Sequence, residues 1–200
     1  MVQRAGLSIR QEPKPAVFID RDGTVNKERS TYVRSVDELE IFADAALALK
    51  PLAERTIPLI MVSNQAGLGK GLFTDEALQA IEDAIQSELQ KEGVSLTAAY
   101  YCRHTAEMNC ACRKPKGGLI LQAAQDLGLD LSVSFMVGDN ARDMAAGRAA
   151  GVKTVFVPTG LHPEVERAKL GDITDYQASD LADAVRWILQ QLDLMLSSMA

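Results

Sequence analysis

The sequence predicts one α/β domain built on a doubly wound, mostly parallel sheet. Short apolar runs alternate with helical patterns along almost all of the 200 residues, and this alternation is typical of parallel strands covered by helices on both faces. Several of the apolar runs end abruptly in polar or acidic residues, as buried strands do at the carboxyl edge of a sheet. We therefore expect a single domain over residues 15–200, preceded by a loose polar tail at 1–14.

Two strands and two helices are expected in the first half of the chain. The apolar runs 16–19 and 59–62 have the length of buried strands, and each ends in polar side chains. Between them, residues 44–55 have a helical pattern, which Pro51 should kink or divide because proline lacks a backbone donor. A longer helix over 74–93 begins at a capping side chain and ends at a glycine.

The second half continues the alternation. Its predicted strands are 98–102, 133–137 and 154–157. Its predicted helices are 118–127, 144–150 and 180–195. The first two of these helices end at a glycine, which commonly stops a helix. The last one carries its apolar side chains on one stripe, so we expect it to pack on the edge of the sheet.

The composition is that of a folded protein with an acidic balance. The chain is 47% hydrophobic and 24% charged, and its 21 Lys and Arg against 27 Asp and Glu give a net charge of -6. A broad basic surface for nucleic acid is therefore not expected. No apolar run approaches the roughly 18 residues that cross a bilayer, and the N-terminus lacks a signal-peptide segment. We expect a cytoplasmic monomer that binds neither membranes nor nucleic acid.

Two further segments receive structural interpretations. The glycine-rich stretch 66–71 lacks the Ser or Thr that follows Gly-Lys in a P-loop, and its spacing is not that of a dinucleotide fingerprint. We interpret it as a mobile loop. His162 stands beside a proline in a polar stretch, so we expect it at the surface.

Acidic and polar side chains follow three of the predicted strands. They are Asp20 and Asp22, Ser63 and Asn64, and Asp139 and Asp143. A single aspartate in such a place more often caps a helix or forms a turn. Three such strand ends can converge on a hard cation such as Mg2+, which prefers oxygen ligands. Because carboxylates alone would repel a phosphate, we expect Arg113, Lys114 and Lys116 to supply positive charge.

The three cysteines form a second constellation with one histidine. The pattern is Cys102-x-His104-x5-Cys110-x-Cys112, and an odd number of closely spaced cysteines suits a metal site better than a disulfide framework. Three thiolates and an imidazole satisfy tetrahedral Zn2+ with protein ligands alone, which predicts a structural metal. Such a site would hold Arg113, the next residue, over the active site.

The pattern as a whole resembles the haloacid dehalogenase-type phosphohydrolases. The resemblance covers roughly residues 16–160 and is carried by Asp20-x-Asp22-Gly-Thr24, by Ser63 and by Gly138-Asp139-x3-Asp143, each after a predicted strand. It implies a phosphatase that transfers the phosphoryl group in line to a nucleophile, with Mg2+ as the cofactor.

The resemblance also implies roles for individual residues. Asp20 matches the nucleophile that becomes an aspartyl phosphate, and Asp22 matches the general acid and base. Ser63 and Lys114 match the groups that bind the transferred phosphoryl oxygens. The implied Mg2+ ligands are Asp20, Asp22 through its backbone carbonyl, and Asp139.

Two of these assignments have rivals. Lys116 flanks the same proline as Lys114, and spacing cannot separate them; we favour Lys114 because Arg113-Lys114-Pro115 matches the triplet of the nearest relatives, which leaves Lys116 exposed. Asp143 either orients the loop of Asp139 or caps the following helix, and we favour the cap.

Four features together resemble a narrow subgroup of the family. They are the zinc motif and the segments Asp20-Arg-Asp-Gly-Thr24, Ser63-Asn-Gln65 and Cys112-Arg-Lys-Pro115. The subgroup contains the heptose-bisphosphate phosphatases and the histidinol-phosphate phosphatases. These relatives have no large cap domain, and loops build a pocket for a small phosphorylated metabolite. The substrate-binding residues that this implies are Glu28, Arg29, Ser30, Thr31, Asn64, Gln65, Arg113 and Asn140.

We favour removal of the 7-phosphate from a heptose 1,7-bisphosphate, because Arg113 and a free-standing domain suit a substrate with a second phosphate. The short zinc loop and Asn140, where some heptose enzymes carry a lysine, favour histidinol phosphate instead. A receiver-type signalling domain would need neither the zinc loop nor an acid/base residue. A zinc-dependent nucleic-acid-binding module is disfavoured by the net charge of -6.

Overall fold

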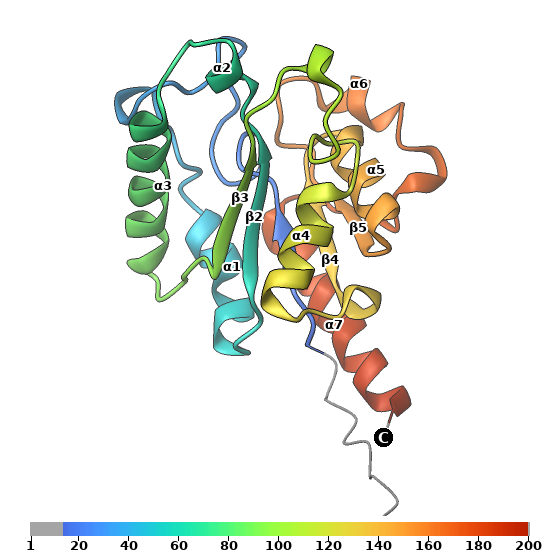
Figure 1. Cartoon of the computed structure of the whole chain (residues 1–200). Coiled ribbons are helices and arrows are strands. Elements are labelled where there is room, and N and C mark those ends of the chain that lie inside the picture. The colour runs from blue at the N-terminus through green and yellow to red at the C-terminus, as the bar shows by residue number, and fades with distance from the viewer. Residues whose placement is uncertain (1–13, 200) are drawn as a thin grey trace, which may run out of the picture.

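A computed structural model describes residues 14–199, which form a six-stranded sheet with helices on both faces (Figure 1). The strands are β1 (Val17–Ile19), β2 (Leu59–Asn64), β3 (Ala98–Cys102), β4 (Phe135–Gly138), β5 (Lys153–Phe156) and β6 (Tyr176–Gln177). Their order is β3-β2-β1-β4-β5-β6, and every neighbouring pair is parallel. The predicted parallel α/β sheet is confirmed. Most of the predicted tail, residues 1–13, lies outside the described residues.

Seven helices are described. They are α1 (Ala45–Glu54), α2 (Ala66–Gly69), α3 (Asp75–Gln90), α4 (Gly118–Leu127), α5 (Ala141–Ala150), α6 (Pro163–Arg167) and α7 (Leu181–Met199). Short 3-10 turns lie at Val36–Glu38, Ala106–Met108, Leu131–Val133 and Gly171–Ile173. The predicted helices thus exist, and α6 and β6 are additions that their short, polar sequences did not reveal.

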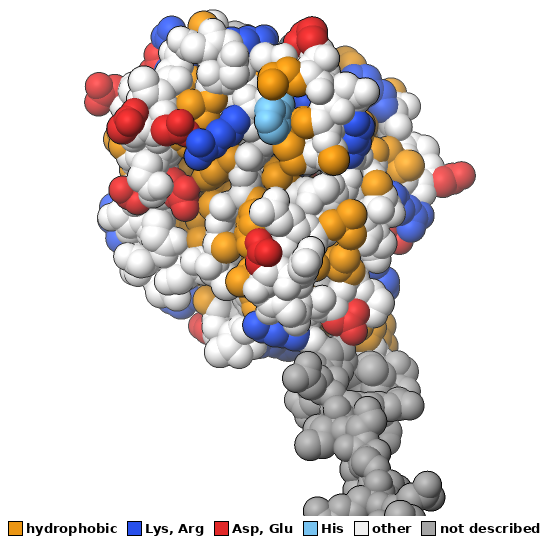
Figure 2. Space-filling view, in the orientation of Figure 1, with side chains coloured by type: hydrophobic (Ala, Val, Ile, Leu, Met, Phe, Trp, Pro, Cys, Tyr) orange, Lys and Arg blue, Asp and Glu red, His pale blue; other side chains and the backbone are white. Residues whose placement is uncertain are grey.

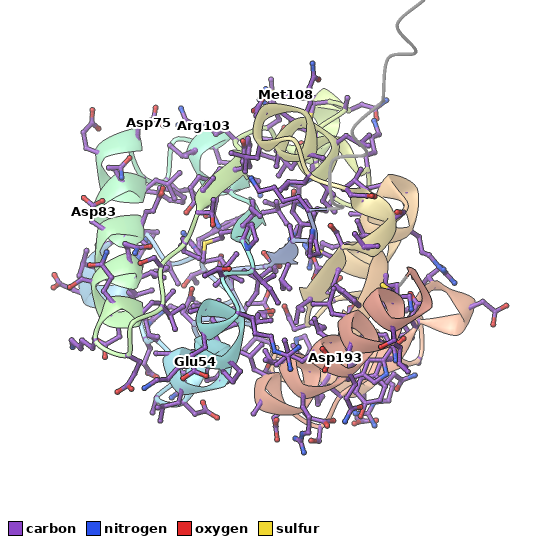
Figure 3. All side chains as sticks on the ribbon, turned by 90° about the horizontal axis from the view of Figure 1, so that it is seen from below. Glu54, Asp75, Asp83, Arg103, Met108 and Asp193 are labelled. Carbon is purple, nitrogen blue, oxygen red and sulfur yellow. The ribbon has the colours of Figure 1, made fainter. Side chains whose placement is uncertain are left out.

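Two apolar cores lie on opposite faces of the sheet, because successive side chains of a strand point to opposite sides. Val17 and Ile19 of β1 pack in one core with α1, α3 and α7. Phe18 packs in the other core with α4 and α5. Seen from below, α1 and α7 lie beside each other, with Glu54 at the end of α1 and Asp193 within α7 labelled (Figure 3). The result is a three-layer α/β/α sandwich.

The strand order places the switch point of the sheet at β1. The chain runs from β1 outward through β2 to β3, and then returns to the other side of β1 as β4. Ile19 pairs with Met61 of β2 and Val137 of β4, so the residues after these strands meet at one edge. Ligands of open α/β sheets bind at this kind of position.

Two local expectations were wrong in part. Pro51 does not divide α1, which continues to Glu54. A residue other than proline at position 51 would donate its backbone amide to the carbonyl of Leu47. Because Leu47 is 56% exposed, water can replace this hydrogen bond. The segment 66–71 is not a loop throughout, because α2 occupies its first four residues. Gly67 serves close packing there, since a Cβ on it would overlap the Phe73 ring.

Other local expectations are confirmed. Thr74 caps α3, its hydroxyl accepting a hydrogen bond from the Ala77 amide at 3.2 Å. His162 is exposed. No helix within residues 14–199 is both long and apolar enough to cross a bilayer. On the face shown in Figure 2, acidic and basic side chains are interspersed.

Candidate active site

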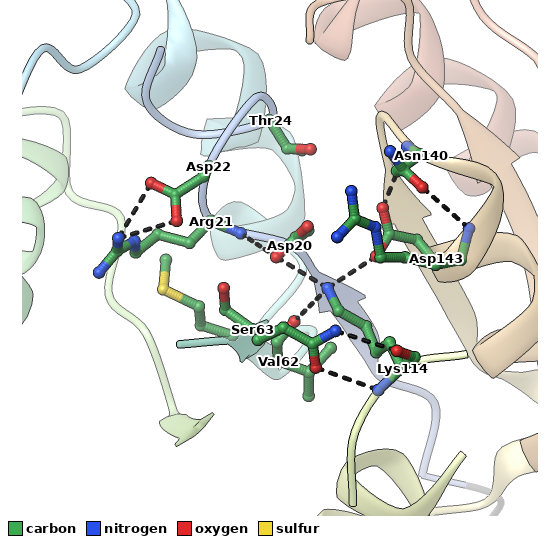
Figure 4. Close-up of polar contacts among 12 residues, drawn as sticks. Asp20, Arg21, Asp22, Thr24, Val62, Ser63, Lys114, Asn140 and Asp143 are labelled. Carbon is green, nitrogen blue, oxygen red and sulfur yellow. Dashed lines mark hydrogen bonds and ion pairs between the residues drawn. The ribbon is translucent and has the colours of Figure 1, made fainter. Parts of the chain in front are cut away.

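Lys114 and Asp20 form the centre of the site at the end of β1. The buried ammonium of Lys114 lies 2.8 Å from Asp20 Oδ1 and 2.7 Å from Asp143 Oδ1, and it donates to the carbonyl of Val62 at 2.9 Å (Figure 4). All three of its protons therefore have acceptors. Although burial opposes the charged form, the carboxylates of Asp143 and Asp20 raise the pKa of Lys114, so it remains a cation.

Asn64 fixes the backbone of Lys114. Its side-chain amide donates to the Lys114 carbonyl at 3.0 Å and accepts from the Lys114 amide at 3.0 Å. This reciprocal pair ties the end of β2 to a residue 50 positions later. Lys116 is placed elsewhere: it is exposed and donates to Asn109 Oδ1 at 2.7 Å and to the Cys110 carbonyl at 2.9 Å. The structure thus brings Lys114, and not Lys116, to Asp20.

Three buried carboxylates meet beside this lysine. One oxygen from each of Asp20, Asp139 and Asp143 lies within 4.8 Å of the others. Burial, together with the charges of Asp143 and Asp20, raises the pKa of Asp139 well above its ordinary value. When all three carboxylates are ionised, the single ammonium of Lys114 leaves two negative charges. An all-oxygen donor set with this excess charge fits a hard divalent cation such as Mg2+.

The backbone wraps tightly around Asp139. A Cβ on Gly160 would overlap Asp139 Oδ2, so any larger residue there would have to displace that carboxylate. On the other oxygen, the hydroxyl of Thr24 donates to Asp139 Oδ1 at 3.2 Å. Asp139 is consequently held in one position at the end of β4.

Asp143 does more than the favoured helix cap. It does cap α5, since Asp143 Oδ2 accepts from the Asn140 amide at 3.1 Å in a capping box. Its other oxygen lies against Lys114. Burial raises the pKa of Asp143 to about 6, although Lys114 opposes that shift. Asp143 therefore caps α5, as favoured, and also contacts Lys114 in the cluster that contains Asp139.

Asp22 lies in a separate hydrogen-bonded group. Arg21 Nη2 donates to both of its oxygens, at 2.9 and 2.8 Å, and Asn26 and Gln65 each donate at 2.9 Å. Gln65 also donates to Ser63 Oγ at 3.0 Å. The Asp22 side chain is thus outside the carboxylate cluster, which agrees with a ligand role limited to its carbonyl.

These residues surround a cavity of about 240 Å³. The predicted site residues that line it are Asp20, Asp22, Glu28, Arg29, Ser30, Ser63, Asn64, Arg113, Lys114, Asp139 and Asn140. Two predicted residues are not brought to its wall: Thr31 is exposed, and Gln65 is buried behind Asp22 and Ser63. Tyr32, Val33, Ala66 and Arg142 also line it. Arg142 was missed, although its place three residues after Asp139, at the same strand end, was a signal.

Three guanidinium groups on the cavity wall form no close ion pair within residues 14–199. Arg29 donates to the Glu38 carbonyl at 3.2 Å, and Arg113 donates to the His104 carbonyl at 3.3 Å. Within residues 14–199, neither these groups nor Arg142 has a carboxylate oxygen within 4.0 Å. Their charges are therefore available to an anionic ligand in the cavity.

The predicted zinc ligands are brought together beside the cavity. Cys102, Cys110 and Cys112 are free thiols with sulfur–sulfur distances of 3.3 to 3.6 Å, and His104 Nδ1 lies 3.3 Å from Cys112 Sγ. The edge of a tetrahedron with Zn–S bonds of about 2.3 Å is roughly 3.8 Å. The cluster therefore fits one tetrahedral soft cation with a closed shell of protein ligands.

Curated relatives cover most of this chain. A D-glycero-beta-D-manno-heptose-1,7-bisphosphate 7-phosphatase of Haemophilus ducreyi is 37% identical over 183 residues, which are 88% of this chain and 98% of the relative. The protein of the same name from Escherichia coli strain K12 is 35% identical over 187 residues, with 88% and 95% covered.

A family model and a solved structure agree with these relatives. The model, described as HAD-hydrolase-like, matches residues 111–184. The crystal structure of D,D-heptose 1,7-bisphosphate phosphatase from B. bronchiseptica, complexed with magnesium and phosphate, is similar with a TM-score of 0.83 and 32% identity. The match covers 88% of this chain and 99% of that one.

Proposed function

Because the chain belongs to the HAD-like hydrolases and is a phosphatase of that family, we propose that it removes the 7-phosphate from D-glycero-D-manno-heptose 1,7-bisphosphate. We propose Mg2+ as the catalytic cofactor and Zn2+ as a structural metal. Curated relatives that are 35 to 37% identical over nearly nine-tenths of the chain carry this activity in their names. The related B. bronchiseptica phosphatase binds magnesium and phosphate.

The division of charge in the cavity carries the proposal. The inner end holds Lys114 and the carboxylate cluster, which suit a phosphoryl group and its cation. The wall holds the three guanidinium groups of Arg29, Arg113 and Arg142, none paired with a carboxylate among the described residues. A substrate with one phosphate to transfer and a second to be held satisfies both ends.

In the first step, Asp20 attacks phosphorus and the bond from phosphorus to the sugar oxygen breaks. Lys114 and the Arg21 amide both contact Asp20 Oδ1, which leaves Oδ2 for the attack. When bound by Asp20, Asp139 and the Asp22 carbonyl, Mg2+ supplies positive charge that lets an anionic phosphate approach the carboxylate. Asp22 gives its proton to the leaving sugar oxygen, so the sugar departs as an alcohol.

Ser63 holds the phosphoryl group during this step. Because Gln65 Nε2 donates to Ser63 Oγ, the hydroxyl proton of Ser63 is free to bond a phosphoryl oxygen. In the second step, a water oxygen attacks phosphorus, Asp22 takes its proton, and the bond from phosphorus to Asp20 breaks. The products are inorganic phosphate and the original Asp20 carboxylate.

A substrate panel tests the proposal. We expect kcat/KM to be highest for the heptose 1,7-bisphosphate, assayed as both anomers because the curated relatives are named for the β form. Heptose 7-phosphate, histidinol phosphate and fructose 1,6-bisphosphate complete the panel, with Asp20→Asn as the control for contaminating phosphatases. A higher kcat/KM for histidinol phosphate would replace the heptose proposal with the alternative function.

A further inference from the structure

Arg21 is a fully buried cation between the two catalytic aspartates. It is the largest fully buried side chain among the described residues. Its Nη2 donates to both oxygens of Asp22, whereas its Nε and Nη1 have no hydrogen-bond partner within residues 14–199 (Figure 4). Burying a guanidinium with unsatisfied donors is unfavourable. The charge is nevertheless retained, and Asp22 is its ion-pair partner among the described residues.

We propose that Arg21 is a positioning residue that holds the Asp22 carboxylate in the orientation needed to activate water in the second step. The inference rests on the proposed function, in which Asp22 is the acid and base. It assigns a task to a side chain that the mechanism above does not use.

The contacts of Asp22 separate Arg21 from its neighbours. Of the two Asp22 oxygens, Asn26 Nδ2 donates to Oδ1 and not to Oδ2, and Gln65 Nε2 donates to Oδ2 and not to Oδ1. Arg21 Nη2 bonds both oxygens at nearly equal distances and therefore opposes swinging of the whole carboxylate away from it, whereas the single-oxygen bonds of Asn26 and Gln65 oppose rotation about the carboxylate axis. The Asp22 side chain remains 23% exposed and lines the cavity. Arg21 thus holds the carboxylate from the buried side while the other side faces the reaction.

The backbone of Arg21 has a different task. Its carbonyl accepts from the Val25 amide at 2.8 Å and from the Asn26 amide at 3.1 Å, and its amide bonds Asp20 Oδ1. These bonds shape the turn after β1. They survive a change of side chain, so substitution of Arg21 tests the guanidinium alone.

The two chemical steps make different demands on Asp22. With p-nitrophenyl phosphate, the leaving phenolate needs no proton, so the first step can proceed without Asp22. In the second step, the attacking water must transfer its proton to the Asp22 carboxylate as the bond from phosphorus to Asp20 breaks. Loss of the correct orientation should therefore slow hydrolysis of the phosphoenzyme and spare its formation.

Rapid-quench kinetics of the Mg2+-loaded protein with p-nitrophenyl phosphate measure the two rates separately. For Arg21→Met we expect hydrolysis of the phosphoenzyme to slow by roughly 10 to 100-fold, the scale of a misplaced catalytic group. Formation of the phosphoenzyme should change by less than roughly 3-fold, so the acid-quenched intermediate accumulates. Arg21→Lys, which keeps the charge and a donor, should show a smaller loss.

Controls separate positioning from stability. Ser134→Ala removes a buried hydroxyl that accepts from the Ala16 amide at 3.0 Å and donates to the Asp130 carbonyl at 2.6 Å, far from Asp22 in the fold. If Ser134→Ala lowers Tm as much as Arg21→Met does, it should change the rates of phosphoenzyme formation and phosphoenzyme hydrolysis by the same factor. If Arg21→Met does not fold, Arg21→Lys is compared with Ser134→Ala in the same way.

Asp22→Asn makes the outcomes distinguishable. Like Arg21→Met, it should slow phosphoenzyme hydrolysis and spare phosphoenzyme formation, but the loss in hydrolysis should be larger. Adding Arg21→Met or Arg21→Lys to Asp22→Asn should change the rate of phosphoenzyme hydrolysis by less than roughly 2-fold. If Asp22→Asn leaves that step unchanged, the acid/base assignment in the proposed function is wrong. Two outcomes would overturn the inference about Arg21 and leave the acid/base role of Asp22 intact. In the first, Asp22→Asn slows phosphoenzyme hydrolysis and the Arg21 variants do not. In the second, the Arg21 variants slow this step by the same factor in the Asp22→Asn background as in the wild-type background.

Discussion

Replacing Lys114 with methionine should destabilise the fold through unpaired carboxylates. The ammonium lies 2.8 Å from Asp20 and 2.7 Å from Asp143, and Asp139 belongs to the same buried cluster. With lysine present and all three carboxylates ionised, the excess negative charge of the cluster is two. Lys114→Met raises that excess to three and leaves the Val62 carbonyl without the donor it now has.

The magnitude follows from the burial of the pair. Removing one partner of a buried ion pair costs about 3 to 5 kcal/mol of unfolding free energy. For a chain of this size, that corresponds to a fall in Tm of roughly 6 to 20 °C. Added Mg2+ should recover part of the loss, because binding to the folded state restores positive charge among the carboxylates.

Urea denaturation after dialysis into metal-free buffer, with and without added Mg2+, measures both effects. The double variant Lys114→Met/Asp143→Asn is the matched control, since it removes one charge of each sign and should be less destabilised than Lys114→Met. A loss below about 1 kcal/mol without Mg2+, the scale of an exposed ion pair, would refute the charge-balance argument.

Four further predictions concern single side chains. Arg113→Ala should lower kcat/KM for a bisphosphate by roughly 10 to 100-fold and for a monophosphate much less; equal losses would place Arg113 at the transferred group. Asp20→Asn should abolish turnover with an unchanged circular dichroism spectrum, and substantial residual turnover would remove Asp20 as nucleophile. Cys110→Ser should lower the zinc content of the purified protein, as measured by elemental analysis. If the purified wild-type protein contains no zinc, the assignment of the Cys/His cluster as a zinc site is wrong. Gly160→Ala, whose new Cβ would overlap Asp139, should weaken Mg2+ binding in calorimetry; an unchanged affinity would argue against Asp139 as a ligand.

The acidic strand ends were predictable because they depend on local pattern. Asp20 and Asp139 each follow an apolar run, and parallel strands bring such ends to one edge. The cysteine spacing was equally local, since Cys102 and Cys112 are only ten residues apart. Recognising these features needed only the alternation of strands and helices and the spacing of the cysteines and the histidine.

The contacts across the site were not predictable in that way. Spacing could not separate Lys114 from Lys116, and it could not show that Gln65 would lie behind Asp22 rather than on the cavity wall. The place of Arg142 three residues after Asp139 was a signal, but whether Arg142 lines the cavity depends on which way the first turn of α5 faces. Each of these outcomes depends on how one loop packs against another.

The sequence by itself determined the parallel α/β architecture, the acidic strand ends and the Cys/His cluster, because each is specified by neighbouring residues through strand and helix periodicity or ligand spacing. Only the tertiary structure decided that Lys114 faces Asp20, that Thr24 bonds Asp139 from 115 positions away, and that Arg21 is buried. The physical reason is the separation along the sequence of the residues that make these contacts. Hydrogen bonds between distant loops form only after the two cores have packed on the sheet, so no short window of sequence contains them.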